Sequence, residues 1–422
     1  MILVKRMCAP TCIVVILIFL LSNCSSKTNT DKRMAKALKI HESALTIDTH
    51  CDTPMHLLRS SFDLGQRHEP GEKGSGNIDF PRMKEGGLDA QFFAIYVSQK
   101  ERTPQGHAKA KKLADDLIDA VKKACSLYPE LVELAATPED AYRLESLGKR
   151  AIYMGMENGY PIGKDLSLLP YFYDRGIRYI TLCHSSNNEI CDSATDFNGP
   201  EWNGLSPFGE KVIHEMNRLG MIIDVSHLSD SSFYDVLRLT KAPVVATHSC
   251  CRSLCDHKRN VTDDMLIALA KNGGVIQMCF VSSFVKKAKP NPKREAALDS
   301  LRTKYGDYEQ LTDPQVKEEY QNAYYEILEH YAGKKATVRD LVDHIDHAVR
   351  LVGIDHVGIG TDFDGGGELE DCDDVTLLPN VTVELLRRGY SEEDIRKIWG
   401  GNFIRVFREV IRTAQELKTA GS

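Results

Sequence analysis

The chain alternates between short apolar runs and longer stretches with helical periodicity. Eight apolar runs follow one another after residue 43, namely Ala44–Asp52, Leu88–Val97, Ala151–Asn158, Ile177–His184, Met221–His227, Ala242–His248, Gly274–Phe280 and His356–Asp364. This alternation is typical of βα units that build a parallel sheet, and eight strands close a barrel. The pattern predicts an α/β fold of the TIM-type (β/α)8 barrel class, in a single domain over residues 41–420.

Amphipathic helices are predicted between the runs, as in His107–Leu127, Pro207–Leu219, Thr262–Lys271 and Thr337–Leu351. Three glycines stand where helices are expected to end, namely Gly176, Gly220 and Gly353. The charged segment Lys286–Lys335 departs most from a minimal barrel and predicts extra helices between strands 7 and 8. The segment Ser391–Leu417 is expected to form a helix pair or one long helix outside the barrel.

The N-terminus has the pattern of an export signal. Lys5 and Arg6 precede an apolar run, Ile13–Leu21, which is too short to span a bilayer. Leu21-Ser22-Asn23-Cys24 looks like a bacterial lipoprotein processing site. We therefore expect residues 1–24 to be a signal and processing region, with Cys24 lipidated as a membrane anchor and residues 25–40 forming a tether. The expected location is the bacterial cell envelope, at the periplasm or outer membrane, with a soluble secreted protein as the alternative.

The amino-acid composition limits the kinds of protein that this chain can be and the kinds of partner that it can bind. Hydrophobic residues make up 42% and charged residues 27% of the 422 residues, so the chain can bury a large core. The net charge of −7 gives no general attraction to nucleic acid. The nine cysteines after Cys24 contain no CxxC pair, which argues against a zinc ribbon. The sequence leaves undecided whether Cys250, Cys251 or Cys255 forms a disulfide, for example with Cys279. It also leaves undecided whether the barrel dimerises.

Ionisable side chains collect where the predicted strands end. These residues are His50, Asp52, Glu157, His184, His227, His248 and Asp362. In a (β/α)8 barrel the carboxyl ends of the strands meet at one rim, where reactive groups lie. Burying seven such groups would cost several kcal/mol each unless they bind a metal or pair with one another. The pattern therefore indicates a metal site at this rim.

The donor types favour two metal ions. His50 and Asp52 share a strand face because strand side chains alternate, so they can bind a first ion. His227 and His248, on neighbouring strands, can bind a second ion, and Glu157 is placed to bridge the two. Imidazole and carboxylate without thiolate suit zinc, although manganese or cobalt would fit the same donors. Two such ions activate water for hydrolysis.

Other polar residues near the rim suggest catalytic and substrate-binding roles. Asp362 faces the same rim and can carry a proton from water to the leaving group, with a further metal-ligand role as the alternative. His184 can stabilise an oxyanion or can be purely structural. After His248 comes a basic loop with Arg252, Lys258 and Arg259, and an arginine there can bind a substrate carboxylate through paired hydrogen bonds.

Taken in order, several motifs resemble the membrane (renal) dipeptidase family of zinc metallopeptidases, which have an amidohydrolase-like barrel. The motifs are Asp48-Thr49-His50-Cys51-Asp52, Gly155-Met156-Glu157-Asn158-Gly159, Tyr179-Ile180-Thr181-Leu182-Cys183-His184, Ile223-Asp224-Val225-Ser226-His227, Arg259-Asn260-Val261 and residues 356–365. The resemblance extends from about Ala44 to Phe407. The segment Lys286–Lys335 and the Cys250-Cys251 pair match the family pattern poorly.

The resemblance implies a zinc-dependent dipeptidase that acts on free dipeptides, including some with a C-terminal D-residue. It implies two Zn²⁺ per chain, bound by His50, Asp52, Glu157, His227 and His248, with Glu157 bridging. It also assigns Asp362, His184 and Glu157 to catalysis, and His184, Arg259 and Asp362 to substrate binding. Two alternatives are another binuclear amidohydrolase, acting on lactones or N-acyl amino acids, and a lipoprotein that binds peptides without cleaving them.

Overall fold

The computed structural model describes residues 32–58, 62–72, 74–306, 311, 313–331 and 333–420. Its strands are β1 Ile47–Cys51, β2 Ala90–Tyr96, β3 Val132–Leu134, β4 Arg150–Glu157, β5 Ile177–Thr181, β6 Ile222–Asp224, β7 Val245–Ser249, β8 Val275–Met278 and β9 Val357–Ile359. Every paired strand is parallel to its neighbours, in the order β1-β2-β4-β5-β6-β7-β8-β9. All eight predicted strands are present, although most are shorter than predicted.

The sheet closes on itself between its first and last strands. The Asp52 amide donates to the Phe363 carbonyl (2.8 Å), and the Asp362 amide donates to the His50 carbonyl (3.0 Å). This joins the end of β1 to the segment after β9. The result is a TIM-type (β/α)8 barrel, as the sequence predicts. The additional strand β3 pairs with the first three residues of β4, outside the closed path.

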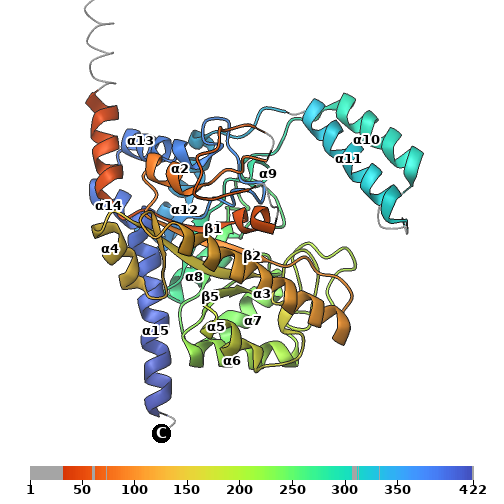
Figure 1. Cartoon of the computed structure of the whole chain (residues 1–422), viewed down its shortest axis with the longest axis horizontal. Helices are drawn as coiled ribbons and strands as arrows, with labels where there is room; N and C mark the ends of the chain where they lie inside the picture. The colour runs from red at the N-terminus through yellow and green to blue at the C-terminus, as the bar shows by residue number, and fades with distance from the viewer. Residues whose placement is uncertain are drawn as a thin grey trace, which may run out of the picture.

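Helices surround the barrel (Figure 1). Their bounds are α2 Phe80–Glu85, α3 Pro104–Leu127, α4 Pro138–Ser146, α5 Leu168–Asp174, α6 Pro207–Leu219, α7 Asp230–Leu239, α8 Asp263–Lys271, α9 Ser282–Val285, α10 Pro292–Tyr305, α11 Pro314–His330, α12 Val338–Val352, α13 Pro379–Arg388, α14 Glu392–Arg396 and α15 Asn402–Ala420. Four of them, α3, α6, α8 and α12, match the predicted helices to within a few residues. Gly220 and Gly353 take the C-cap positions of α6 and α12, and Gly176 follows Arg175, the C-cap residue of α5.

The predicted extra helices between strands 7 and 8 of the barrel are α10 and α11, together with the short α9. Figure 1 shows α10 and α11 side by side, projecting from the body of the molecule. Lys286, just before them, pairs with Asp340 of α12 (2.6 Å). The charged composition of this segment therefore corresponds to a helical hairpin with a large exposed surface.

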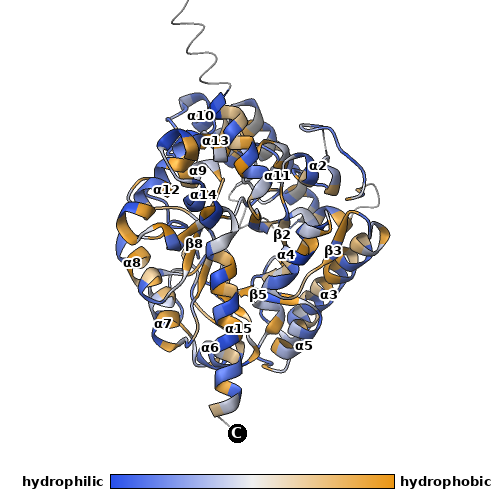
Figure 2. Ribbon diagram, turned by 90° about the vertical axis from the view of Figure 1, so that its left-hand side faces the viewer, coloured by the Kyte–Doolittle hydropathy of each residue, from blue (hydrophilic) through white to orange (hydrophobic). Residues whose placement is uncertain are grey.

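The C-terminal segment was expected to lie outside the barrel, and its last helix instead closes the bottom of it. Phe403 and Phe407 of α15 join the buried cluster formed by Phe92 and Tyr153, residues of β2 and β4. Viewed from the side in Figure 2, α15 crosses the middle of the ring of helices. The π-helical residues Lys397–Gly401 connect α14 directly to α15. The opposite rim is left for polar side chains.

The N-terminal predictions fall largely outside the described residues. The signal region 1–24 and Cys24 are not described, whereas residues 32–43 form a helix with Ala37 and Ile40 buried. The tether predicted for residues 25–40 is therefore helical over its described part, because apolar side chains at this spacing pack against the domain. No helix within residues 32–420, as far as the structure describes them, is long and apolar enough to cross a membrane.

Candidate functional site

The barrel brings all seven predicted rim residues together. His50 and His248 lie within β1 and β7, and Glu157 is the last residue of β4. The other four follow strand ends by one to three residues and so belong to the βα loops; they are Asp52, His184, His227 and Asp362. Six of the seven are at most 8% exposed, while His184 is partly exposed. The parallel barrel thus gathers residues that are up to 312 positions apart in the sequence.

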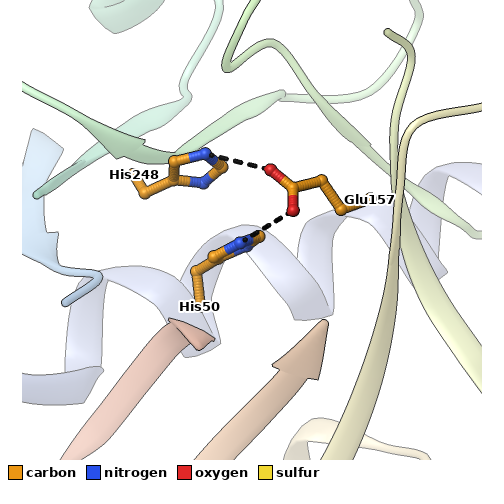
Figure 3. A group of neighbouring side chains, drawn as sticks. All are labelled: His50, Glu157 and His248. Atoms are coloured by element: carbon orange, nitrogen blue, oxygen red, sulfur yellow. Dashed lines mark ion pairs between the residues drawn. The ribbon is translucent and has the colours of Figure 1, made fainter. Parts of the chain in front are cut away.

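Glu157 occupies the centre of this group. Its carboxylate lies between the rings of His50 and His248, with one oxygen directed to each (Figure 3). The Nε2 atom of His50 is 3.5 Å from Oε2, and the Nε2 atom of His248 is 3.5 Å from Oε1. The Nε2 atom of His227 is 3.1 Å from the same Oε1. The two oxygens of Glu157 therefore face two separate groups of donors.

Each group of donors contains further ligand atoms. On one side, the Nε2 atom of His50 lies 3.8 Å from Asp52 Oδ2 and 4.0 Å from Asp362 Oδ1. On the other side, the Nε2 atoms of His227 and His248 are 2.9 Å apart. Both ring nitrogens thus point to one small volume. Three triads could each hold a metal ion, because the ligand atoms within each triad lie no more than 4.8 Å apart. The triads are His50–Glu157–His248, Glu157–His184–His227 and His50–Asp52–Asp362.

Two buried ligand atoms lack a hydrogen-bond partner, which fits a bound cation. The Nε2 atom of His50 and Oδ1 of Asp52 are buried and have no hydrogen-bond partner. An unsatisfied buried polar atom is costly, and a bound metal ion would satisfy both atoms. Nitrogen and carboxylate oxygen donors without thiolate suit zinc and related divalent ions. The residues present therefore fit a metal centre, in agreement with the sequence-based prediction.

Burial and neighbouring charges shift the pKa values of the histidines. Burial, followed by the positive charge of Arg259, lowers the pKa of His227 well below its usual range. Burial also lowers the pKa of His248 well below that range, and that of His184 to about 4. Burial opposes protonation of His50 too, but the carboxylates of Glu157 and Asp52 raise its pKa well above the usual range. Neutral imidazoles at His227 and His248 are the form that binds metals.

The backbone around Asp362 is held in an unusual conformation. Asp362 and His227 both have positive φ angles, 61° and 70°, which are uncommon for residues other than glycine. Gly365 packs so closely that a Cβ atom there would lie 2.1 Å from Asp52 Oδ2 and 2.3 Å from Asp362 Oδ1. Burial raises the pKa of Asp362 well above its usual range; the charge of His50 opposes this shift, and the carboxylates of Asp52 and Glu157 add to it. Such strain and burial are typical of functional positions.

Sequence reasoning did not identify several hydrogen bonds that orient the residues of the site. The Tyr179 hydroxyl lies 2.8 Å from His50 Nδ1, and the Thr247 hydroxyl lies 2.8 Å from His248 Nδ1. Asp48 accepts from the amide and hydroxyl of Thr361 (2.8 and 2.7 Å), and so joins β1 to the segment before Asp362. Tyr179 and Thr361 are distant in sequence from the residues that they contact, whereas Thr247 directly precedes His248 on β7, and periodicity alone identifies none of these contacts.

A cavity of about 360 Å³ opens onto the metal-binding residues. It is lined by Asp52, Glu157, His184, Ser185, Thr195, His227, Arg259, Val281, Phe284, Asp362 and Gly365. Of the three basic residues considered after His248, Arg259 lines the cavity and is buried, whereas Arg252 pairs with Asp230 at 2.7 Å. Sequence reasoning missed the wall formed by Val281 and Phe284, because that segment matches no recognised motif.

The cysteines near the site are free thiols. All nine cysteines that the structure describes, from Cys51 to Cys372, are buried and unpaired, so the bridge left open in the sequence does not form among them here. The Cys250 thiol donates instead to the Cys279 carbonyl (3.2 Å), and the Cys279 thiol lies 3.7 Å from Asp362 Oδ2.

The chain is similar to known dipeptidases over most of its length. The family model described as Membrane dipeptidase (Peptidase family M19) matches residues 34–421. A dipeptidase of Claviceps purpurea, tcpJ, is 33% identical and covers 88% of this chain and 78% of its own. Dipeptidase 3 of Mus musculus is 32% identical over 90% of this chain and 68% of its own.

Solved structures show the same fold. The probable dipeptidase PvdM from Pseudomonas aeruginosa is 34% identical, with a TM-score of 0.81 over 91% of this chain and 99% of its own. A metallopeptidase from Rhodobacter sphaeroides, liganded with a phosphinate mimic of the dipeptide L-Ala-D-Ala, is 25% identical. Its TM-score is 0.69, over 86% of this chain and 99% of its own.

Proposed function

The chain belongs to the membrane dipeptidase family of metallopeptidases, and from this premise we propose that its metal-dependent hydrolysis of dipeptides uses two zinc ions. The proposed ligands are His50 and Asp52 for one ion, His227 and His248 for the other, and Glu157 between them. One observation carries this assignment. One oxygen of Glu157 faces the Nε2 atom of His50 at 3.5 Å, and the other faces the Nε2 atoms of His227 and His248 at 3.1 and 3.5 Å.

Such a centre, when loaded, supplies Lewis-acid chemistry that acidifies water and polarises the scissile carbonyl. The protein's own residues must then move protons and stabilise charge. Asp362 lies 4.0 Å from His50 across this centre and lines the cavity, so its carboxylate can accept a proton from water. It later returns that proton to the leaving amine.

His184 is suited to donate a hydrogen bond to the developing oxyanion. Burial lowers its pKa to about 4, so the ring is neutral at physiological pH. The Ser185 hydroxyl lies 2.9 Å from His184 Nδ1 and can donate to it, which leaves the proton on Nε2. That atom lies 3.8 Å from Glu157 and is directed into the site. A neutral imidazole with a fixed tautomer is an effective hydrogen-bond donor.

Arg259 is proposed to bind the C-terminal carboxylate of the substrate. Its guanidinium is buried and lines the cavity, donates to the His248 carbonyl (3.2 Å), and has an unpartnered Nε. A free carboxylate would satisfy that buried cation through charge-assisted hydrogen bonds. The Rhodobacter sphaeroides relative binds a mimic of L-Ala-D-Ala. We therefore include dipeptides with a C-terminal D-residue among the substrates proposed here.

The test is release of free amino acids from L-Ala-L-Ala and L-Ala-D-Ala by zinc-loaded protein, alongside Asp362→Asn. We expect wild-type turnover and a loss of about 10²-fold to 10⁴-fold in the variant, with two zinc ions per chain in both. Chelator should abolish turnover in the wild type. Absence of dipeptide cleavage by zinc-loaded wild type contradicts the proposal and directs the screen to lactones and N-acyl amino acids. A zinc content of one per chain contradicts the two-ion centre.

We also propose that the mature protein is anchored in the bacterial envelope through a lipid on Cys24. The support is the Leu21-Ser22-Asn23-Cys24 pattern after a short apolar run. Labelling of cells with a radioactive fatty acid should mark the wild type, and Cys24→Ala should be unlabelled. An unlabelled wild-type protein in the culture medium would favour the soluble secreted form.

A further inference from the structure

The cavity over the metal-binding residues has one apolar wall. Among the described residues that line it, Val281 and Phe284 carry wholly apolar side chains, and the others are charged, polar or glycine. Both belong to the turn of α9, Phe284 within the helix and Val281 at its N-cap. This turn leads into the charged segment that matches the family pattern poorly. The apolar wall is therefore supplied by a part of the chain that the recognised motifs do not cover.

The wall and Arg259 are held together as one unit. The Arg259 guanidinium carbon lies 5.4 Å from the centre of the Phe284 ring. The side-chain amide of Asn260, the next residue along the chain, donates to the Phe284 carbonyl (2.8 Å) and to the Cys255 carbonyl (2.8 Å). On the far side of α9, His344 Nε2 lies 2.8 Å from the Val285 carbonyl. These hydrogen bonds hold the backbone of α9 beside the loop that carries Arg259.

The other end of the wall is tied to the loop that holds Asp362. Val281 forms an antiparallel bridge with Gly367, whose amide donates to the Asp362 carbonyl (2.7 Å). The wall therefore spans from the proposed carboxylate-binding residue to the proposed proton carrier. In a dipeptide whose carboxylate binds Arg259 and whose scissile carbonyl lies over Glu157, the α-carbon of the C-terminal residue must lie between Arg259 and Glu157, beside this wall.

From this arrangement we propose that Phe284, with Val281, selects the side chain of the substrate's C-terminal residue. The inference rests on the proposed dipeptidase function and on Arg259 as the carboxylate anchor. The C-terminal side chain packs on the Phe284 ring, so an apolar side chain is preferred over a polar one of equal size. The N-terminal side chain lies on the other side of the scissile bond, towards the polar lining, and does not contact the wall.

The experiment compares kcat/KM for pairs of dipeptides of similar size. Ala-Leu against Ala-Asn, and Ala-Val against Ala-Thr, report on the C-terminal residue, and Leu-Ala against Asn-Ala reports on the N-terminal residue. For wild type we expect kcat/KM to be about tenfold or more higher for the dipeptide with the apolar C-terminal residue. A difference of one small group in an apolar pocket changes kcat/KM by about this factor. Phe284→Ala should reduce that ratio by about tenfold and leave the N-terminal ratio unchanged within about twofold. Phe284→Leu should retain most of the preference.

A matched control separates selection from a loss of packing. Phe208 is also a partly buried phenylalanine packed against the same apolar cluster, and it does not line the cavity. Phe208→Ala should leave both ratios unchanged. The inference is overturned if wild type cleaves dipeptides without a C-terminal preference, or if Phe284→Ala changes the two ratios equally. Failure of wild type to cleave any of the dipeptides would instead overturn the proposed function itself.

Discussion

The Nδ1 atom of His50 lies 2.8 Å from the hydroxyl of Tyr179, a residue of β5 that is buried in the barrel interior. This contact orients the imidazole so that its Nε2 atom points to Glu157 and Asp52. A hydrogen bond to the second ring nitrogen fixes both the tautomer and the direction of a metal-ligating histidine. Strand β5, three strands from β1 in the sheet order, therefore supports the candidate metal centre although none of its own residues is a proposed ligand.

Tyr179→Phe should weaken metal binding without unfolding the protein. The substitution removes the hydroxyl and keeps the ring, and loss of such a partner typically costs about tenfold to 100-fold in metal affinity. Competition with a chromogenic chelator measures the affinity. Tyr153→Phe is the matched control, because Tyr153 is also buried and donates to the Thr137 carbonyl (2.7 Å), away from the metal-binding residues. Equal metal affinities in the two variants would show that the Tyr179 contact does not support the centre.

Gly365→Ala should damage the site more than the fold. A Cβ atom at this position would overlap the carboxylates of Asp52 and Asp362, at 2.1 and 2.3 Å. We expect both carboxylates to be displaced, with activity at least about 100-fold lower, because small misplacements of reacting groups have such effects. Activity and thermal unfolding are measured in parallel with Gly333→Ala, where the added Cβ atom meets nothing within 4 Å. Normal turnover by the Gly365 variant would contradict the close packing described here.

Arg259→Met should reduce the cleavage of dipeptides that carry a free C-terminal carboxylate more than the cleavage of dipeptide amides, which lack it. If Arg259 binds the C-terminal carboxylate, loss of the charge should reduce kcat/KM for Ala-Ala by about 100-fold, since a buried charge-assisted hydrogen bond contributes roughly 3 kcal/mol. The same change should have little effect on the slower cleavage of Ala-Ala amide, which lacks that carboxylate. Arg252→Met, which removes a cation paired with Asp230, serves as the control. An equal loss on both substrates would assign Arg259 a structural role.

The fold was predictable because its pattern is local and repeated. Each barrel strand is a short apolar run, and eight such runs at regular intervals leave few alternatives to a closed parallel barrel. The sequence did not predict that α15 closes the bottom of the barrel, because the amphipathic pattern of a helix identifies an apolar face and not the surface that it covers. Phe403 and Phe407 fit equally well against the outside of a sheet until the barrel interior is known.

The metal-binding residues were predictable because strand ends converge at one rim, so His50, Glu157 and His248 could be grouped without a structure. The supporting contacts could not be predicted in this way. Tyr179 and Thr247 act through hydroxyl groups that have no characteristic spacing, and each lies on a strand where it also fits an ordinary barrel position. Phe284 was missed for a different reason, since it lies in a short turn before the charged segment that no recognised motif covers.

His41 gives the fold a pH dependence that is separate from the metal centre. The indole N–H of Trp399 donates to the Thr382 hydroxyl (2.7 Å), so that hydroxyl donates its own proton to His41 Nδ1 (2.8 Å). His41 Nε2–H then donates to the Gly86 carbonyl (2.9 Å). This network requires a neutral ring. Burial lowers the pKa of His41 from 6.5 to about 4, although the Gly86 hydrogen bond opposes the shift.

The sign of the effect follows from the proton balance. Between about pH 6.5 and pH 4 the unfolded chain binds a proton at His41 and the folded chain does not, so the free energy of unfolding falls as the pH is lowered through this range. The contribution is complete above pH 6.5, and about 2 kcal/mol of it should be lost between pH 7.5 and pH 5. His41→Gln, which stays neutral, should show a correspondingly smaller drop over that interval in denaturant unfolding. His214→Gln replaces an exposed histidine and should keep the wild-type drop. If His41→Gln and His214→Gln lose the same free energy between the two pH values, protonation of His41 does not limit stability in acid.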